Sequence, residues 1–197
     1  FTGYGFFITE PQGGPQAGIW VYTGDVEESE VSIAVGDRIA ISGVIAEYYG
    51  DEGKGSITEL ILQNSADIEI IGTGNLPSIE VLSTADLADP ATAELWESCL
   101  VAVEDVTVEN DYLGYGEWMV DDGVIVDDMF IEGSPINGEV LEMVAGPLYF
   151  SYGNYKIEPR SADDLVWTCP AEACADDLVA GDIVITELMA DPAADRW

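Results

Sequence analysis

Apolar residues along this chain fall in short runs that glycine, asparagine, aspartate and proline separate. Short runs rich in valine, isoleucine and aromatic residues between turn formers are typical of β-strands. The runs that fit this pattern are Tyr4 to Thr9, Gly18 to Tyr22, Arg38 to Tyr49, Ile57 to Leu62, Ile68 to Ile71, Leu100 to Val108, Glu117 to Val120, Val124 to Phe130, Val140 to Tyr152 and Tyr155 to Ile157. A helical pattern occurs in Ser83 to Glu97, where Pro90 breaks or restarts the helix. The pattern predicts an all-β protein with one short helical connection.

These runs repeat once along the chain in the same order. The sequence Gly-Tyr-Gly-Phe-Phe-Ile at residues 3–8 returns as Gly-Tyr-Gly-Glu-Trp-Met at residues 114–119. Further matches join residues 18–21 to 123–126, residues 36–41 to 138–143, and residues 65–67 to 161–163. A glycine interrupts the long run in both copies, Gly43 in the first and Gly146 in the second. Such a repeat indicates two copies of one structural unit.

Each copy has the strand order of a small barrel, with a long strand that contains the central glycine. A glycine inside a long strand marks a bend that lets the strand serve both sides of a barrel. We therefore predict two tandem OB-like five-stranded Greek-key barrels, with a β-sandwich as the alternative. The first module spans residues 1–75, a linker with a short helix spans 76–98, and the second module spans 99–167.

The two modules differ at their start. The second module opens with the strand Leu100 to Val108 before its Gly-Tyr-Gly, whereas the first has only Phe1 and Thr2 in that place. The first barrel is therefore predicted to lack its own first strand, which leaves two unpaired edges and an open core. Beyond a linker at residues 168–180, residues 181–197 contain an orphan strand, Gly181 to Met189, of about the missing length.

The charge of the chain excludes several classes of partner. Lysine and arginine number 5 against 39 aspartates and glutamates, histidine is absent, and the net charge is −34. Nucleic acids and anionic membranes are bound mainly through lysine and arginine, so we expect neither as a partner. No residue constellation indicates an enzyme, and the absence of histidine excludes a histidine triad. The acidity indicates a protein that works in salt or among divalent cations, or simply a solvated acidic surface.

Two motifs have candidate chemistry of their own. Cys169 and Cys174 are predicted to close a small disulfide loop, with two free thiols as the alternative. Calcium takes several carboxylate oxygens, so the acidic pairs around the second hairpin are a candidate site, with solvated turns as the alternative. The predicted calcium ligands are Asp121, Asp122, Asp127 and Asp128. No other cofactor is expected.

Residues 3–166 resemble a known module. Gly5-Phe6-Phe7-Ile8, Pro11 to Pro15 and Gly18-Ile19-Trp20-Val21-Tyr22 resemble the OB-fold module of secreted bacterial nucleases, where it accompanies an endonuclease/exonuclease/phosphatase-type domain. This resemblance implies an OB fold and an extracellular or cell-surface location. Gly181 to Met189, followed by Asp191-Pro192, resembles the opening strand of a bacterial lamin-tail domain.

These features together predict a non-enzymatic structural protein that binds copies of itself. The orphan strand of one subunit would complete the first barrel of the next, which builds a head-to-tail filament. The predicted donor residues are Ile183, Val184, Ile185, Thr186, Leu188 and Met189, of which either alternate set faces inward. The predicted acceptor groove is Phe6, Ile8, Trp20, Ile39 and Ile41.

Two other readings of the same features stay open. In the first, the orphan strand folds back within its own subunit or has no partner strand. In the second, the chain is an accessory module of a secreted nuclease or surface protein, and it binds nucleic acid or polysaccharide with the help of calcium.

Overall fold

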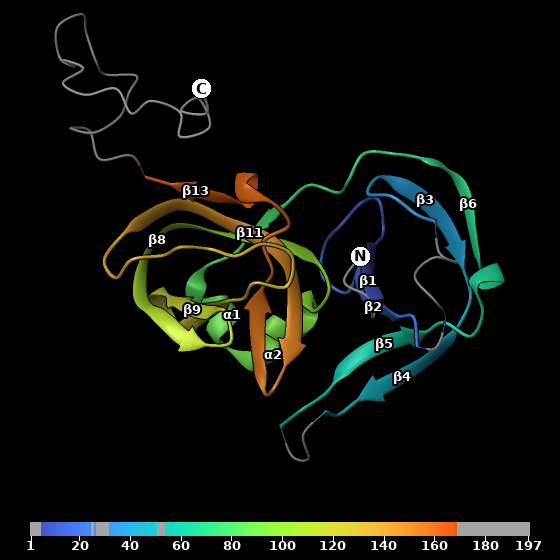
Figure 1. Cartoon of the computed structure of the whole chain (residues 1–197), viewed down its shortest axis with the longest axis horizontal. Helices are drawn as coiled ribbons and strands as arrows, with labels where there is room; N and C mark the ends of the chain where they lie inside the picture. Colours follow the sequence, from blue (N-terminus) through green and yellow to red (C-terminus); the bar gives the residue numbers. More distant parts are fainter. Residues whose placement is uncertain (1–4, 25, 27–31, 51–53, 169–197) are drawn as a thin grey trace, which may run out of the picture. The chain divides into compact units, whose positions relative to one another are not determined.

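β-Strands account for most of the regular structure (Figure 1). The structure is a computed structural model that describes residues 5–24, 26, 32–50 and 54–168. The strands of the first module are β1 (Gly5–Thr9), β2 (Gly18–Tyr22), β3 (Asp37–Ile41), β4 (Val44–Tyr48), β5 (Ile57–Ile61) and β6 (Ile68–Thr73). Those that follow are β7 (Glu80–Val81), β8 (Leu100–Gly114), β9 (Glu117–Val120), β10 (Val124–Val126), β11 (Val140–Ser151), β12 (Asn154–Ile157) and β13 (Leu165–Trp167). The predicted β-rich class is confirmed.

The connection between the modules is helical, as its sequence pattern predicts. Helix α1 (Thr84–Ala88) begins after Ser83, whose side chain accepts a hydrogen bond from the backbone N–H of Asp86. Helix α2 (Pro90–Ala93) follows at once, with Pro90 in the first turn, where a missing N–H costs nothing. Strand β7, just before α1, was not predicted. No helix in the described part of the chain has the length and apolar character needed to cross a membrane.

In the second module, strand pairing closes into a ring. Strand β8 pairs with β9, β9 with β10, β10 in parallel with β12, β12 with β11, and β11 with β8 again. Strand β13 adds to the other side of β11. Because β8 is 15 residues long, it reaches both β9 and β11 and joins the two sides of the ring.

The first module has the same pairings except those of β8. Strand β1 pairs with β2, β2 in parallel with β5, β5 with β4, and β3 with β6. The long strand expected at Arg38 to Tyr49 is divided here into β3 and β4, on either side of Gly43. No strand among the described residues joins β1 to β3, so the pairing does not close.

The structure corrects the register of the sequence repeat. The alignment by sequence places Phe7 opposite Trp118, but the strand ladders pair Phe6 with Val21 and Trp118 with Val126. Since Val21 and Val126 are equivalent, Phe6 is the structural counterpart of Trp118, one residue away from the sequence alignment. The reason is packing: Phe6 and Trp118 are the buried side chains, whereas Glu117 is only half-buried.

The central glycines have the same steric role in both modules. A Cβ on Gly146 would collide with the backbone carbonyl of Glu158, and one on Gly43 would collide with the Leu60 side chain and the Ile61 carbonyl. Ile61 and Glu158 are equivalent residues, since Leu60 and Ile157 occupy matching places in the parallel ladders. Both glycines therefore allow the long strand to pass close to the end of a neighbouring strand, which is β5 in the first module and β12 in the second.

Close contacts join the two modules within the unit that ends at Trp167. The backbone N–H of Gln16 donates to the carbonyl of Leu95 at 2.7 Å, and the N–H of Thr58 donates to a carboxylate oxygen of Glu97 at 2.9 Å. A Cβ on Gly18 would collide with the Ser98 carbonyl, so the backbones meet there without an intervening side chain. Backbone groups and side chains of both modules therefore meet at this junction.

Candidate functional site: an open edge in the first module

The main asymmetry of the molecule is an open edge in the first module. We define the open edge as the sides of β1, β3 and the start of β4 that correspond to the sides of β9 and β11 covered by β8. In the second module β8 pairs with β11 from Thr107–Val140 to Leu100–Pro147 and with β9 from Val108–Val120 onward. No described residue pairs with the matching sides of β1 and β3. Backbone donors and acceptors along such an edge are available to an added strand.

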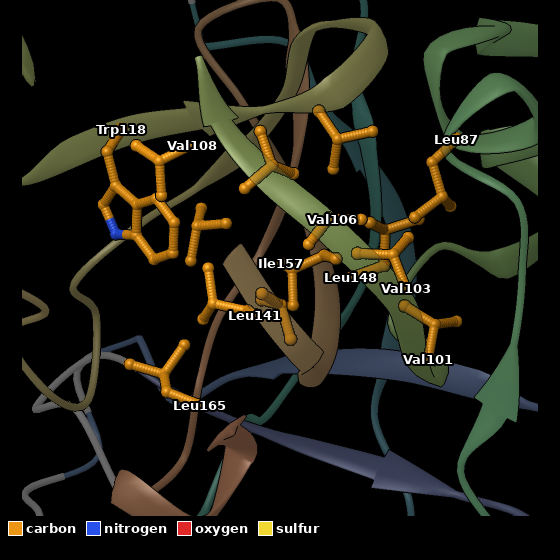
Figure 2. Close-up of a cluster of buried hydrophobic side chains, with 14 of the residues drawn as sticks. Leu87, Val101, Val103, Val106, Val108, Trp118, Leu141, Leu148, Ile157 and Leu165 are labelled. Atoms are coloured by element: carbon orange, nitrogen blue, oxygen red, sulfur yellow. The ribbon is translucent and has the colours of Figure 1, made fainter. Parts of the chain in front are cut away.

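The cores of the two modules differ in the number of buried apolar residues, as expected if a strand is missing at the open edge. The second module and its linker bury sixteen apolar residues in one cluster, including Val101, Val103, Val106 and Val108 of β8, which Figure 2 shows gathered in the core. The core cluster of the first module contains only four buried residues among those that the structure describes: Phe6, Val21, Leu60 and Leu62. Trp20 and Ile57 are buried outside this cluster. Half-buried residues surround the four cluster residues, namely Ile8, Ile19, Val26, Ile33, Ile39, Ile41 and Ile68. The apolar core of the first module therefore reaches the surface.

Equivalent residues show where the core is open. The ladders of β3 with β6 and of β11 with β13 make Ile39 equivalent to Leu141 and Ile41 equivalent to Val144, the latter one residue away from the sequence repeat. Ile8, Ile39 and Ile41 are half-buried, while their counterparts Val120, Leu141 and Val144 are fully buried. These sets flank the edge on which β8 lies in the second module. Further along the same long strand, Ile45 is 60% exposed, whereas its counterpart Leu148 is 1% exposed. A covering strand is the main difference between the two environments.

Four of the five predicted acceptor residues lie together. Phe6, Ile8, Ile39 and Ile41 belong to one apolar cluster beside the open edge. Trp20 does not join them, because its ring lies on the other face of β2, 4.7 Å from the ring of Phe7 and 5.3 Å from that of Tyr149. Alternation along a strand explains the difference, since Trp20 and its neighbour Val21 point to opposite faces. Trp20 therefore belongs to the junction with the second module.

The predicted donor strand and the predicted disulfide lie outside the described residues. This holds for Ile183, Val184, Ile185, Thr186, Leu188 and Met189, and for Cys169 and Cys174. The third cysteine, Cys99, is a buried free thiol in the core cluster of the second module.

The four predicted calcium ligands are engaged with protein groups in different places. Asp121 accepts from the backbone N–H of Thr107 at 2.8 Å, and Asp122 accepts from the hydroxyl of Thr84 at 2.6 Å. Asp127 instead contacts Lys156, and burial raises the pKa of Asp128 with help from the charge of Asp127. Among the described residues no three cysteines, aspartates or glutamates are grouped as a metal site. The geometry gives the calcium prediction no support.

A buried lysine, which the sequence analysis did not single out, neutralises part of this acidic region. Lys156 is 2% exposed and contacts the carboxylates of Glu117 and, at 2.9 Å, Asp127. Burial lowers the pKa of Lys156, but its bonds to these carboxylates outweigh burial, and the pKa is raised. The feature of the sequence that could have indicated this buried lysine is its place next to Ile157 in a short predicted strand. The equivalent residue of the first module is Glu59, opposite Trp20.

The burial of two glutamates, Glu158 and Glu97, was not predicted, because their sequence context does not differ from that of exposed glutamates. Burial, followed by the charge of Asp127, raises the pKa of Glu158 to about 8. Burial also raises the pKa of Glu97, at the junction, to about 7. One carboxylate oxygen of each has no hydrogen-bond partner. Burial therefore shifts both side chains toward the neutral form, compared with an exposed glutamate.

Comparison with known proteins found no matching family model, no matching curated protein and no matching solved structure.

Proposed function

We propose that this protein is a non-enzymatic structural subunit that assembles with copies of itself. Residues 181–189 of one subunit add as a strand to the open edge of the first module of the next subunit. Strand addition satisfies the edge by main-chain hydrogen bonds and buries alternate side chains. Because donor and acceptor are different surfaces, the contact is head-to-tail and produces a filament unless a ring closes.

The fold assignment supports this proposal. The closed pairing of β8, β9, β10, β12 and β11 suits a five-stranded Greek-key barrel of OB type. The first module has four of the five corresponding strands, with its long strand divided at Gly43. We propose that both modules are OB-like barrels and that the first is completed by the added strand.

A single observation carries the proposal: the open edge of the first module is the place that β8 fills in the second. The pairing and exposure of β1, β3 and β4 mark this edge as unfilled among the described residues. In the second module, where β8 occupies this position, Val101, Val103 and Val106 are all 2% exposed or less. Covering the equivalent surface removes apolar area from water, the main driving force for association.

Charge sets the conditions for assembly. Each subunit has a net charge of −34, so subunits repel each other at low ionic strength. Salt screens this repulsion, with a screening length of about 10 Å at 0.1 M. Apolar insertion and backbone pairing depend little on salt. Assembly should therefore strengthen as salt is added, as expected of a protein at the cell surface or outside the cell.

Truncation tests the proposal. We compare the intact chain with one chain that ends at Asp177 and another that ends at Asp191, by sedimentation velocity over a series of concentrations and salt. The intact chain and the chain ending at Asp191 should form larger species at high concentration and salt. The chain ending at Asp177, which lacks the donor strand, should stay monomeric. Electron micrographs of the intact chain should show filaments.

Two outcomes would contradict self-assembly. If the chain ending at Asp177 assembles as well as the intact chain, strand donation is wrong. If the intact chain is monomeric throughout, the strand folds back or serves no such role. Retention of the monomer on DNA or polysaccharide columns, with and without calcium, would then support the accessory-module alternative.

A further inference from the structure

The strand that fills the gap in the second module has an irregular inward pattern. Val101, Val103, Val106 and Val108 of β8 are buried, so the spacing between inward residues is two, three and two. The extra residue falls at Glu104 and Asp105, both exposed, and Asp105 has a backbone φ of 52°. The partner strand β11 has the same spacing of three between its buried residues Leu141 and Val144, so the β8–β11 ladder keeps one register throughout.

The proposed donor strand has the same pattern, residue by residue. Aligning Val101 with Ile183 places apolar residues on all four inward positions of β8, namely Ile183, Ile185, Leu188 and Ala190. The two exposed polar positions, Glu104 and Asp105, fall on Thr186 and Glu187. A regular alternating strand offers no such match. It would place either Glu187, together with Ile183 and Ile185, or Thr186, together with Val184 and Leu188, in the core.

We infer that the donor strand enters the open edge with the inward pattern of β8, so that Ile183, Ile185 and Leu188 point inward. This inference rests on the proposed function and chooses between the two faces of the donor strand. The ladder of β8 with β11 pairs Val103 with Val144 and Val106 with Leu141. Ile41 and Ile39 are the counterparts of Val144 and Leu141, because they pair with Ile68 and Ile70 as Val144 and Leu141 pair with Leu165 and Trp167. Strand β3 has one residue fewer than β11 between these positions. Ile185 therefore lies opposite Ile41, Leu188 lies opposite Ile39, and Thr186 and Glu187 form a β-bulge opposite Ala40.

The fit extends to both ends of the strand. In the second module Val101 lies opposite Gly146, so Ile183 lies opposite Gly43. Val108 lies opposite Val120, so Ala190 lies opposite Ile8. Each half-buried residue that flanks the open edge thereby gains an apolar partner.

Charge also complements this occupant. Arg38 on β3 is exposed and belongs to no ion pair among the residues that the structure describes. The register places Met189 opposite Arg38 and the carboxylates of Glu187 and Asp191 diagonally across from it, within reach of a long side chain. One of the five basic residues of the chain therefore meets two acids of the donor.

A matched pair of substitutions tests the register. Ile185→Asp and Thr186→Asp each add one negative charge at neighbouring donor positions. Ile185→Asp buries a carboxylate in the apolar core and should weaken assembly roughly 100-fold or more, measured by sedimentation velocity. Thr186→Asp leaves the charge in water and should assemble nearly as the parent chain does.

The outcomes separate this inference from the proposed function. If the parent chain assembles and Thr186→Asp, not Ile185→Asp, abolishes assembly, the register is wrong and strand donation stands. If both variants assemble normally, or neither does, the donor strand has no single inward face and the inference fails. If the parent chain itself does not assemble, the proposed function fails first.

Disulfide trapping gives a second measurement of the register. Residues directly opposite in an antiparallel pair bring their Cβ atoms within about 5 Å, close to disulfide geometry. In a background with Cys169→Ser and Cys174→Ser, the pair Ile41→Cys with Ile185→Cys should form covalent oligomers under mild oxidation. The control pair Ile41→Cys with Thr186→Cys should not. Faster linkage of the control pair would overturn the register, and linkage within a single subunit would overturn donation between subunits.

Discussion

The two modules have the same strand pairings except for one strand, and this difference separates a closed core from an open one. In the second module β8 covers β9 and β11 and buries its four valines. In the first module the matching sides of β1 and β3 have no partner strand among the described residues, and Ile8, Ile39 and Ile41 stay half-buried. The comparison teaches that the pairing order and the bending glycine arise without the first strand, whereas complete burial of the core requires it.

The largest expected effect is on folding of the second module. Val103 is fully buried, so Val103→Asp places an unpaired charge in a closed core and should lower the free energy of unfolding by about 4 kcal/mol or more. Ile41→Asp, at the equivalent place on the partner strand of the first module, should cost about 1 kcal/mol in the monomer, since water already reaches Ile41. Urea denaturation of the monomers measures both. Equal losses would mean that the first core is closed.

An intermediate effect is expected at the central glycines. Gly146→Ala directs a methyl group at the Glu158 carbonyl inside a closed module and should cost about 2–3 kcal/mol, as overpacking does. Gly43→Ala should cost less, about 1 kcal/mol, because the open core of the first module can relax around Leu60. Thermal or urea unfolding measures the order of the two. A larger loss for Gly43→Ala would contradict an open, adaptable first module.

The smallest effect is a pH dependence in the stability of the second module. Glu158 occupies the place of Ile61, and its folded-state pKa of about 8 lies above the ordinary value of 4.5. A carboxyl with a raised pKa favours folding at low pH, and this contribution is lost as pH rises through about 8. Glu158→Gln stays neutral, so it should match the parent at pH 4 and be more stable by about 2 kcal/mol at pH 9.

Unfolding by urea at several pH values measures this difference. The exposed Glu104→Gln in the same module is the control and should change stability by less than about 0.5 kcal/mol at any of these pH values. A stability gain from Glu158→Gln that is the same at pH 4 and pH 9 would contradict the raised pKa.

Much of the fold was predictable because it is local in sequence. Alternating and β-branched runs predicted most of the strands, and the repeat predicted the two modules and the matching role of Gly43 and Gly146. The same repeat predicted that β1 and β3 have no strand equivalent to β8 beside them, and none pairs with them among the described residues. Among the acceptor residues, Phe6, Ile8, Ile39 and Ile41 were predicted together and lie together.

Features that depend on distant partners were not predictable. The repeat alignment is wrong by one residue at Phe6 and Trp118, because burial, not residue identity, sets the register of a strand. Trp20 was placed on the wrong face for the same reason. The raised pKa values of Glu97 and Glu158 result from burial against residues far away in sequence, and no local pattern marks them.

The small core of the first module has a thermodynamic consequence. Among its described residues the core cluster has four buried apolar side chains and seven that are only half-buried, so under the proposed function part of its folding free energy comes from another molecule. Its apparent unfolding temperature would rise with subunit concentration by mass action, while that of the second module would stay constant. One chain would then contain a module whose stability is independent of subunit concentration and another whose stability depends on binding a second subunit.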